Sequence, residues 1–397
     1  MNVLVVDEEL PWPLDTGKRL RSYNLLQRLQ RHHAITYLCY GTPGVVALPD
    51  CPNVSVVVVP SPILKQQGAR FYGQLLANLL SPNPYIVDRH YSRAFSQKAV
   101  SLVTEGGFDL LHCEWTPYTE NILPLLGRIP TVLSAHNVEA QIWERYFLTE
   151  PNPAKRIYIY LQWKKLRRYE AAAARRYSAV STVSQPDRDV FVNDYGCPQV
   201  QVVPNGVDER YYTPAVVPVT PGSMVFTGSM DWRPNQDGVR YFIEQVFPLI
   251  RRQTPDATFC VVGRNPPAWL STLAEQTAGV TVTGTVPDVR PYIARSALYL
   301  VPLRVGGGSR LKILEALAMG KTVLSTTVGA EGLTVQDGVT ILLRDTPREL
   351  AATACRVLAD RDEYAALGAV GRELVLRSYT WDAIAKTMAE LWESARG

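Results

Sequence analysis

The stretch Val301-Pro302-Leu303-Arg304-Val305-Gly306-Gly307-Gly308-Ser309-Arg310-Leu311-Lys312-Ile313-Leu314-Glu315-Ala316 contains the unit from which the chain is built. An apolar strand ends at Pro302, and three glycines then let the backbone turn tightly and approach a ligand. A helix is expected to begin near Ser309, which is a good N-cap residue. A strand, a glycine turn and a helix in this order are typical of a parallel α/β sheet.

The same alternation extends outward from this stretch over the whole chain, in two series of short apolar runs. The first series predicts strands at 3–7, 35–39, 54–59, 110–113, 131–135, 179–183 and 200–203. The second predicts strands at 224–228, 259–262, 280–283, 298–301, 322–325 and 340–343. Because helical patterns separate the runs, each series predicts a parallel sheet covered on both faces.

The chain has 397 residues, more than one hydrophobic core usually supports. Residues 210–222 carry three prolines and a glycine without helical or strand period, which is typical of a linker. We therefore expect an amino-terminal domain over 1–209 and a carboxyl-terminal domain over 223–378. The predicted fold is two Rossmann-like, doubly wound domains facing a cleft, with ligands at the carboxyl ends of the strands.

The composition is that of an ordinary soluble protein, with 46% hydrophobic and 20% charged residues. A formal charge of +4 is too weak to indicate a nucleic-acid partner. The six cysteines are scattered without metal-ligand spacing, which favours a reducing compartment. The first residues predict a strand and not a signal peptide, and no apolar run is long enough to span a bilayer. A cytoplasmic location is expected, with any membrane contact peripheral.

Two cations make the glycine stretch a candidate phosphate site. Arg310 and Lys312 fall in the first turn of the predicted helix, where a cation is unfavourable unless an anion is bound. The simpler alternative is a glycine turn with two solvated cations. Glu315 could accept hydrogen bonds from a ribose, or it could form an ordinary i,i+3 pair with Lys312.

Two further candidates follow strands of the amino-terminal series. Gly17 precedes a helix whose first turn carries Lys18, Arg19 and Arg21, again the wrong sign for an empty helix terminus. The loop lacks the spacing of a P-loop, and a solvated basic loop is the alternative. His136 follows the strand at 131–135, where it could donate to a ligand oxygen or simply cap the next helix.

Residues 155–176 form a basic helix interleaved with aromatic side chains. Such a helix can lie on an anionic membrane surface, but it is more often a surface helix with a packed aromatic face. We favour the second interpretation slightly and leave a peripheral membrane contact open. No other feature supports binding of nucleic acid.

Taken together, these residues resemble the retaining glycosyltransferases of family 4, which have the GT-B fold, over nearly the whole chain. The resemblance rests on the Thr16-Gly17 loop, His136-Asn137, Val203-Pro204-Asn205-Gly206-Val207-Asp208, Gly228, Val262-Gly263, Gly284-Thr285-Val286 and the segment from Gly307 to Glu315. A last element, Tyr379-Thr380-Trp381 with the helix after it (379–397), resembles the family's crossover back onto the amino-terminal domain.

The resemblance implies transfer of a hexosyl group from a nucleotide-diphosphate sugar to an acceptor hydroxyl, with retention of configuration and without a metal or another cofactor. The acceptor would be a bacterial glycan, a lipid-linked saccharide or a small molecule. The implied catalytic residues are His136, Arg310 and Lys312. The implied donor-binding residues are Gly17, Gly228, Ser229, Gly263, Arg264, Val286, Gly307, Gly308, Ser309, Leu311 and Glu315. Acceptor-side candidates are Lys18, Arg21 and Asn137.

The chain departs from the family pattern in three places. Gly307 stands where the family has the first glutamate of its E-x7-E motif, and Ser229 and Asp237 stand where it usually has Arg and Lys. Arg310 and Lys312 would then neutralise the diphosphate. The alternatives are a GT-B epimerase and a non-catalytic nucleotide-sugar binder. An NAD enzyme is disfavoured because no G-x-G-x-x-G follows the first strand.

Overall fold

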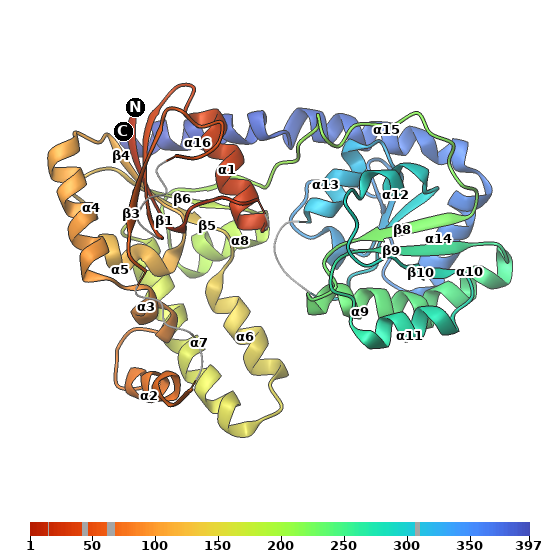
Figure 1. Ribbon diagram of the computed structural model, residues 1–397, viewed down its shortest axis with the longest axis horizontal. Helices are drawn as coiled ribbons and strands as arrows, with labels where there is room; N and C mark the ends of the chain where they lie inside the picture. Colours follow the sequence, from red (N-terminus) through yellow and green to blue (C-terminus); the bar gives the residue numbers. More distant parts are fainter. Residues whose placement is uncertain (15, 42–46, 62–67, 306–309) are drawn as a thin grey trace. The chain divides into compact units, whose positions relative to one another are not determined.

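The computed structural model describes residues 1–14, 16–41, 47–61, 68–305 and 310–397. The described chain forms two compact units: Met1–Pro204 with Ile384–Gly397, and Asn205–Ala383. Each unit has its own parallel sheet and its own hydrophobic core (Figure 1).

Unit 1 contains a seven-stranded sheet of order β3-β2-β1-β4-β5-β6-β7. Its strands are β1 (Asn2–Glu9), β2 (Ala34–Tyr40), β3 (Val54–Val59), β4 (Leu110–Cys113), β5 (Thr131–Ala135), β6 (Ala179–Thr182) and β7 (Val200–Val202). Its helices are α1 (Gly17–Leu29), α2 (Gly68–Asn78), α3 (Tyr85–His90), α4 (Arg93–Gly106), α5 (Thr119–Ile122), α6 (Glu139–Thr149), α7 (Pro153–Ala174) and α8 (Gln185–Asp189).

Unit 2 contains a six-stranded sheet of order β10-β9-β8-β11-β12-β13. Its strands are β8 (Ser223–Thr227), β9 (Thr258–Val262), β10 (Val280–Val282), β11 (Leu298–Val301), β12 (Val323–Ser325) and β13 (Leu342–Leu343). Its helices are α9 (Arg233–Tyr241), α10 (Phe247–Gln253), α11 (Ala268–Gln276), α12 (Arg290–Arg295), α13 (Leu311–Ala318), α14 (Pro347–Ala359) and α15 (Arg361–Ser378). The last helix, α16 (Trp381–Arg396), starts in unit 2 and continues into unit 1.

Each predicted strand is confirmed, and the pairing within both sheets is parallel. The inner strands are buried on both faces, as the unbroken burial of β4, β5, β6 and β11 shows. This is why their sequences read as continuous apolar runs and not as alternating ones.

The helix after the glycine stretch begins later than we predicted. Ser309, the expected N-cap, lies outside the described residues, as do Gly306, Gly307 and Gly308. Within the described part, Arg310 is the N-cap residue of α13 and Leu311 its first residue. Lys312 therefore remains in the first helical turn, where its charge opposes the helix dipole.

Candidate functional site

The carboxyl end of the sheet in unit 2 is built around two glycines in contact. Gly228 follows β8 and Gly263 follows β9, and the amide of Gly228 donates to the carbonyl of Val262 at 2.9 Å. A Cβ atom on Gly263 would lie 1.8 Å from the carbonyl oxygen of Gly228. No side chain fits there, so the backbone of the two glycines is bare of side chains at this strand end.

Lys312 extends from α13 to this bare backbone. Its Nζ donates to Oδ1 of Asn235 at 2.7 Å and lies 4.1 Å from the centroid of the Phe226 ring. A Cβ atom on Gly228 would lie 2.6 Å from the same Nζ. The ammonium group thus occupies the space that a side chain at Gly228 would need.

The electrostatic environment of Lys312 opposes its positive charge. Burial lowers the pKa of Lys312 to about 7, the nearby Arg310 guanidinium also lowers it, and Glu315 only partly offsets the two. The hydrogen-bond acceptor of the ammonium is a neutral amide, and the ring face contributes a weaker attraction. A bound anion would restore the charged form, because an opposite charge nearby favours it.

Arg310 and Glu315 both interact electrostatically with Lys312. Arg310 is only 3% exposed, and its Nη2 donates to the carbonyl of Val328 at 3.2 Å. Glu315 interacts with Lys312 and accepts a hydrogen bond from Tyr212, while burial raises the pKa of its carboxyl group. Both alternatives for Glu315, the pair with Lys312 and a ribose contact, are compatible with this position.

The remaining predicted donor-binding residues fall into two groups: polar residues next to the two glycines, and apolar residues packed against the core of unit 2. Nε of the exposed Arg264 donates to Oγ of Ser229 at 2.9 Å. Val286 and Leu311 pack against the core of unit 2. Asp237, at one of the positions where the family usually has a cation, instead pairs with Arg304 at 2.6 Å. The predicted donor residues Gly307, Gly308 and Ser309 lie outside the described residues.

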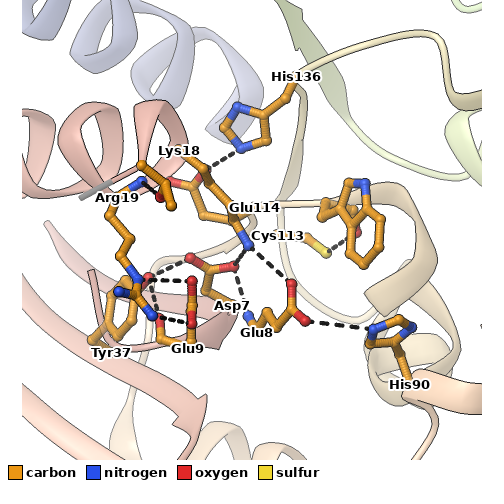
Figure 2. A network of polar contacts seen from close by, with 12 residues as sticks. Asp7, Glu8, Glu9, Lys18, Arg19, Tyr37, His90, Cys113, Glu114 and His136 are labelled. Carbon is orange, nitrogen blue, oxygen red and sulfur yellow. Dashed lines mark hydrogen bonds and ion pairs between the residues drawn. The ribbon is translucent and has the colours of Figure 1, made fainter. Parts of the chain in front are cut away.

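In unit 1, charged side chains gather at the carboxyl end of β1 (Figure 2). Nζ of Lys18 lies 2.5 Å from Oδ1 of Asp7 and 3.7 Å from Oε2 of Glu8. The hydroxyl of Tyr37 donates to the other Asp7 oxygen at 2.5 Å. Burial lowers the pKa of Lys18, but attraction from Asp7 and Glu8 outweighs it, so that the pKa is raised overall. Lys18 is therefore neutralised by the protein itself.

His136 lies just past β5 and is held by a carboxylate. Its Nε2 is 3.0 Å from Oε2 of Glu114, which follows β4 (Figure 2). Burial raises the pKa of Glu114, but hydrogen bonds from His112 and His136 outweigh it and hold the pKa well below its usual range. A carboxylate and an imidazole are thus brought together at neighbouring strand ends.

The other predicted residues of unit 1 have different surroundings. Gly17 is exposed and is the first residue of α1, whose N-cap Thr16 accepts from the amide of Arg19. Arg21 is buried, and its guanidinium donates to the carbonyls of Pro204 at 2.6 Å and Val203 at 2.8 Å. The Asn137 side chain hydrogen-bonds the carboxylate of Glu139.

Sequence reasoning missed three residues that shape these sites: Asp7, Glu114 and Asn235. Asp7 and Glu114 each stand at or just past the end of a strand that we predicted correctly. Applying the strand-end rule to His112-Cys113-Glu114 would have found the second of them. The role of Asn235 could not be predicted from a local sequence pattern, because it lies 77 residues from Lys312, whose ammonium group donates to it.

Across the described residues, no cluster of three or more His, Cys, Asp or Glu side chains could hold a metal ion. Within the same ranges, no helix combines the length and the apolar character needed to cross a membrane.

Two family models match the chain. The model described as Glycosyltransferase Family 4 matches residues 20–211, and the one described as Glycosyl transferases group 1 matches residues 221–360. A GDP-mannose-dependent alpha-(1-6)-phosphatidylinositol monomannoside mannosyltransferase of Mycobacterium tuberculosis is 31% identical over 159 residues, which is 36% of this chain. The match spans 41% of that relative's own length.

Solved structures resemble the chain over its whole length. Sucrose-phosphate synthase from Thermosynechococcus elongatus has a TM-score of 0.71 and 18% identity, with 99% of this chain and 98% of that one covered. The Anabaena protein HepE in complex with UDP and glucose has a TM-score of 0.65 and 17% identity, with 99% and 100% covered. At such identities the likeness concerns the fold alone.

Proposed function

We propose that this chain, which belongs to the group 1 (family 4) glycosyltransferases with the GT-B fold, transfers a hexosyl group from a nucleotide-diphosphate sugar to an acceptor hydroxyl. The observation that carries the proposal is Lys312, a partly buried ammonium with a lowered pKa, an amide acceptor and bare backbone beside it. A diphosphate would supply the missing negative charge.

The proposed mechanism uses Arg310 and Lys312 to stabilise the diphosphate as its bond to the anomeric carbon breaks. Preorganised cations and amides in a water-poor site are most effective against charge that develops during the reaction. The departing phosphate oxygen takes the proton of the acceptor hydroxyl, which attacks on the same face, so the anomeric configuration is retained. His136 contacts the donor sugar. No metal takes part, so EDTA is expected to leave activity unchanged.

Donor choice is tested first by thermal shift with UDP-, GDP-, ADP- and TDP-sugars, because a donor that binds the folded chain stabilises it by mass action. GDP-mannose and UDP-glucose head the panel, since GDP-mannose is named for the mannosyltransferase relative and the HepE complex holds UDP and glucose. A raised melting temperature with one nucleotide class supports the proposal. No shift with any of them would contradict it.

The dependence of product formation on an acceptor distinguishes a transferase from an epimerase and from a non-catalytic nucleotide-sugar binder. A transferase releases nucleoside diphosphate only when an acceptor is present. An epimerase would change the sugar without an acceptor. A non-catalytic binder, the possibility raised by Gly307, would bind donor tightly but give neither product with a broad acceptor panel.

We further propose that unit 1 contacts an anionic membrane surface through the hairpin of α6 and α7. Residues 141–168 hold seven Lys or Arg and two Glu, against a net charge of +4 for the whole chain. Exposed apolar side chains gather in the hairpin, in α2, which lies beside α7 (Figure 1), and in the turn directly after α2. They are Tyr72, Leu76, Leu79, Leu80, Tyr146, Leu148, Ile157, Tyr160 and Leu161. Cations beside exposed aromatic and aliphatic side chains are typical of helices that bind membrane interfaces.

Sedimentation with vesicles tests this contact. The chain is expected to bind vesicles that contain phosphatidylglycerol and not vesicles of phosphatidylcholine alone. Leu148→Ser with Ile157→Ser should weaken binding, whereas Val370→Ser with Leu376→Ser, at exposed positions of α15, serves as the matched control. Equal binding by both double variants would contradict the contact.

A further inference from the structure

Each carboxylate oxygen of Glu114 contacts a histidine. Its Oε2 lies 3.0 Å from Nε2 of His136, and its Oε1 lies 3.4 Å from Nε2 of His112. Glu114 is 4% exposed and His112 is 2% exposed, so water cannot readily replace either contact. We call His112, Glu114 and His136 the His–Glu–His chain.

The far end of the His–Glu–His chain is fixed by the carboxyl-terminal helix. Nε1 of Trp392, in α16, donates to Nδ1 of His112 at 3.0 Å, and Trp392 is 1% exposed. An indole nitrogen can only donate, so Nδ1 of His112 must be an acceptor and carry no proton. The proton of His112 therefore sits on Nε2 and points at Glu114.

The same reasoning extends through Glu114 to His136. The two imidazoles hold the pKa of Glu114 well below its usual range, even though burial raises it. Lys18 and Arg21 interact favourably with this carboxylate and Asp7 unfavourably. An ionised carboxylate can only accept hydrogen bonds, so Nε2 of His136 must donate and carry a proton. In the neutral imidazole, Nδ1 of His136 is then an acceptor.

We propose that Glu114 is a positioning residue. It is held in place by His112, which Trp392 anchors, and it makes His136 present Nδ1 to the ligand as a hydrogen-bond acceptor. The ligand group opposite His136 must then be a hydrogen-bond donor such as a hydroxyl, and not an ionised phosphate or a carbonyl oxygen. This reverses our expectation from the sequence that His136 donates to a ligand oxygen. The inference rests on the proposed function for the identity of that hydroxyl, which belongs to the sugar.

Long-range ¹H–¹⁵N correlation of histidine side chains in the full chain tests the protonation pattern directly. The chain has only five histidines, so each can be assigned by single substitution. In their neutral forms, His112 and His136 are both expected as the Nε2–H tautomer. An Nδ1–H signal for His136 in the unaltered protein would overturn the inference.

The substitution Glu114→Gln is expected to change the tautomer of His136. An amide offers one acceptor and one donor group, so it cannot accept from two imidazoles at once. Because Trp392 still holds Nδ1 of His112, His136 is the ring that must change, and its Nδ1–H tautomer should appear. If Glu114→Gln does not fold, the tautomer of His136 in the unaltered protein still decides the matter, because an Nδ1–H signal there contradicts the inference. Trp381→Phe, also a buried tryptophan of α16, is the control and should leave both tautomers unchanged.

Kinetics separate positioning from a merely structural role. Glu114→Gln is expected to lower kcat about tenfold, the equivalent of one lost hydrogen bond, while the donor KM stays within about twofold. Unchanged tautomers and an unchanged kcat in a folded Glu114→Gln variant would overturn the inference. If the unaltered chain transfers no sugar, the proposed function fails, but the tautomer measurement still decides the inference by itself.

Discussion

Lys18 and Lys312 occupy equivalent places in the two units, each in the first turn of a helix at the carboxyl end of a sheet, yet their surroundings differ. Lys18 lies 2.5 Å from a carboxylate oxygen of Asp7, and its pKa is raised because Asp7 and Glu8 outweigh its burial. Lys312 donates to the amide of Asn235, and burial lowers its pKa to about 7.

The difference shows that a cation in the wrong helical turn does not by itself indicate a ligand site. At Lys18 the protein supplies the counter-charge, so the ammonium belongs to the structure of unit 1. At Lys312 the counter-charge is incomplete, so the ammonium is available to an anion from outside. The predictions below test this contrast, beginning with the largest effect.

Lys18→Met should destabilise the fold by about 3 kcal/mol, because it leaves the buried carboxylate of Asp7 without its cation. The free energy of unfolding is measured by denaturant titration at pH 7. Lys18→Met with Asp7→Asn should recover part of the loss. A change of less than about 1 kcal/mol in the single variant would show that Lys18 is not a structural ion-pair partner.

Lys312→Met should have the opposite profile. It is expected to weaken nucleoside-diphosphate binding by about 2 kcal/mol, roughly 30-fold, because a charge-assisted hydrogen bond to phosphate is lost. The free energy of unfolding should change by less than about 1 kcal/mol, since an apolar side chain replaces a poorly compensated charge. Calorimetric titration measures the affinity, and unaltered affinity would remove Lys312 from the donor site.

The lowered pKa of Lys312 predicts a pH dependence of nucleotide binding. Free Lys312 is charged below pH 7 and neutral above it, and the bound diphosphate favours the charged form. Affinity should therefore fall about fivefold between pH 7 and pH 8, with uptake of up to about one proton per nucleotide. Calorimetry at pH 8 in buffers of different ionisation enthalpy measures this uptake. Lys312→Met should abolish it, whereas a buffer-independent heat in the unaltered chain would contradict it.

Gly228→Ala should give the smallest effect. The added Cβ would lie 2.6 Å from Nζ of Lys312, so the ammonium must move away from Asn235. The Cβ would also lie 2.8 Å from Nδ2 of Asn235, and Gly228 has a φ of +156°, which residues with side chains rarely adopt. We therefore expect some loss of stability together with a fall of about threefold in diphosphate affinity. Gly73→Ala, where the added atom meets open space, is the control. A loss in both variants would point to a general effect of replacing glycine.

Most of the fold could be predicted from the sequence, because parallel strands that are buried on both faces appear as continuous apolar runs. Runs such as Leu298–Val301 and Leu110–Cys113 are wholly buried, so nothing polar interrupts them. The start of α13 was harder to locate. Several residues of the glycine stretch can end a strand or begin a helix, so local propensity alone does not choose among them.

The site was predictable only in outline. Strand ends located Gly228, Gly263 and His136, because parallel sheets bind ligands at that edge. The partners of these residues come from distant parts of the chain. Trp392 lies 280 residues from His112, and Glu114 lies 22 residues from His136. No local sequence pattern predicts contacts between residues so far apart in the chain.

The sequence by itself therefore determined the order of strands and helices, the glycine turns and the two basic helix starts, because these depend on local periodicity and backbone geometry. Only the tertiary structure decided which lysine is neutralised by the protein and which ring nitrogen His136 leaves for a ligand. The physical reason is that a pKa and a tautomer depend on burial and on charges and donors a few ångströms away in space. Folding brings those groups together from residues far apart in the chain.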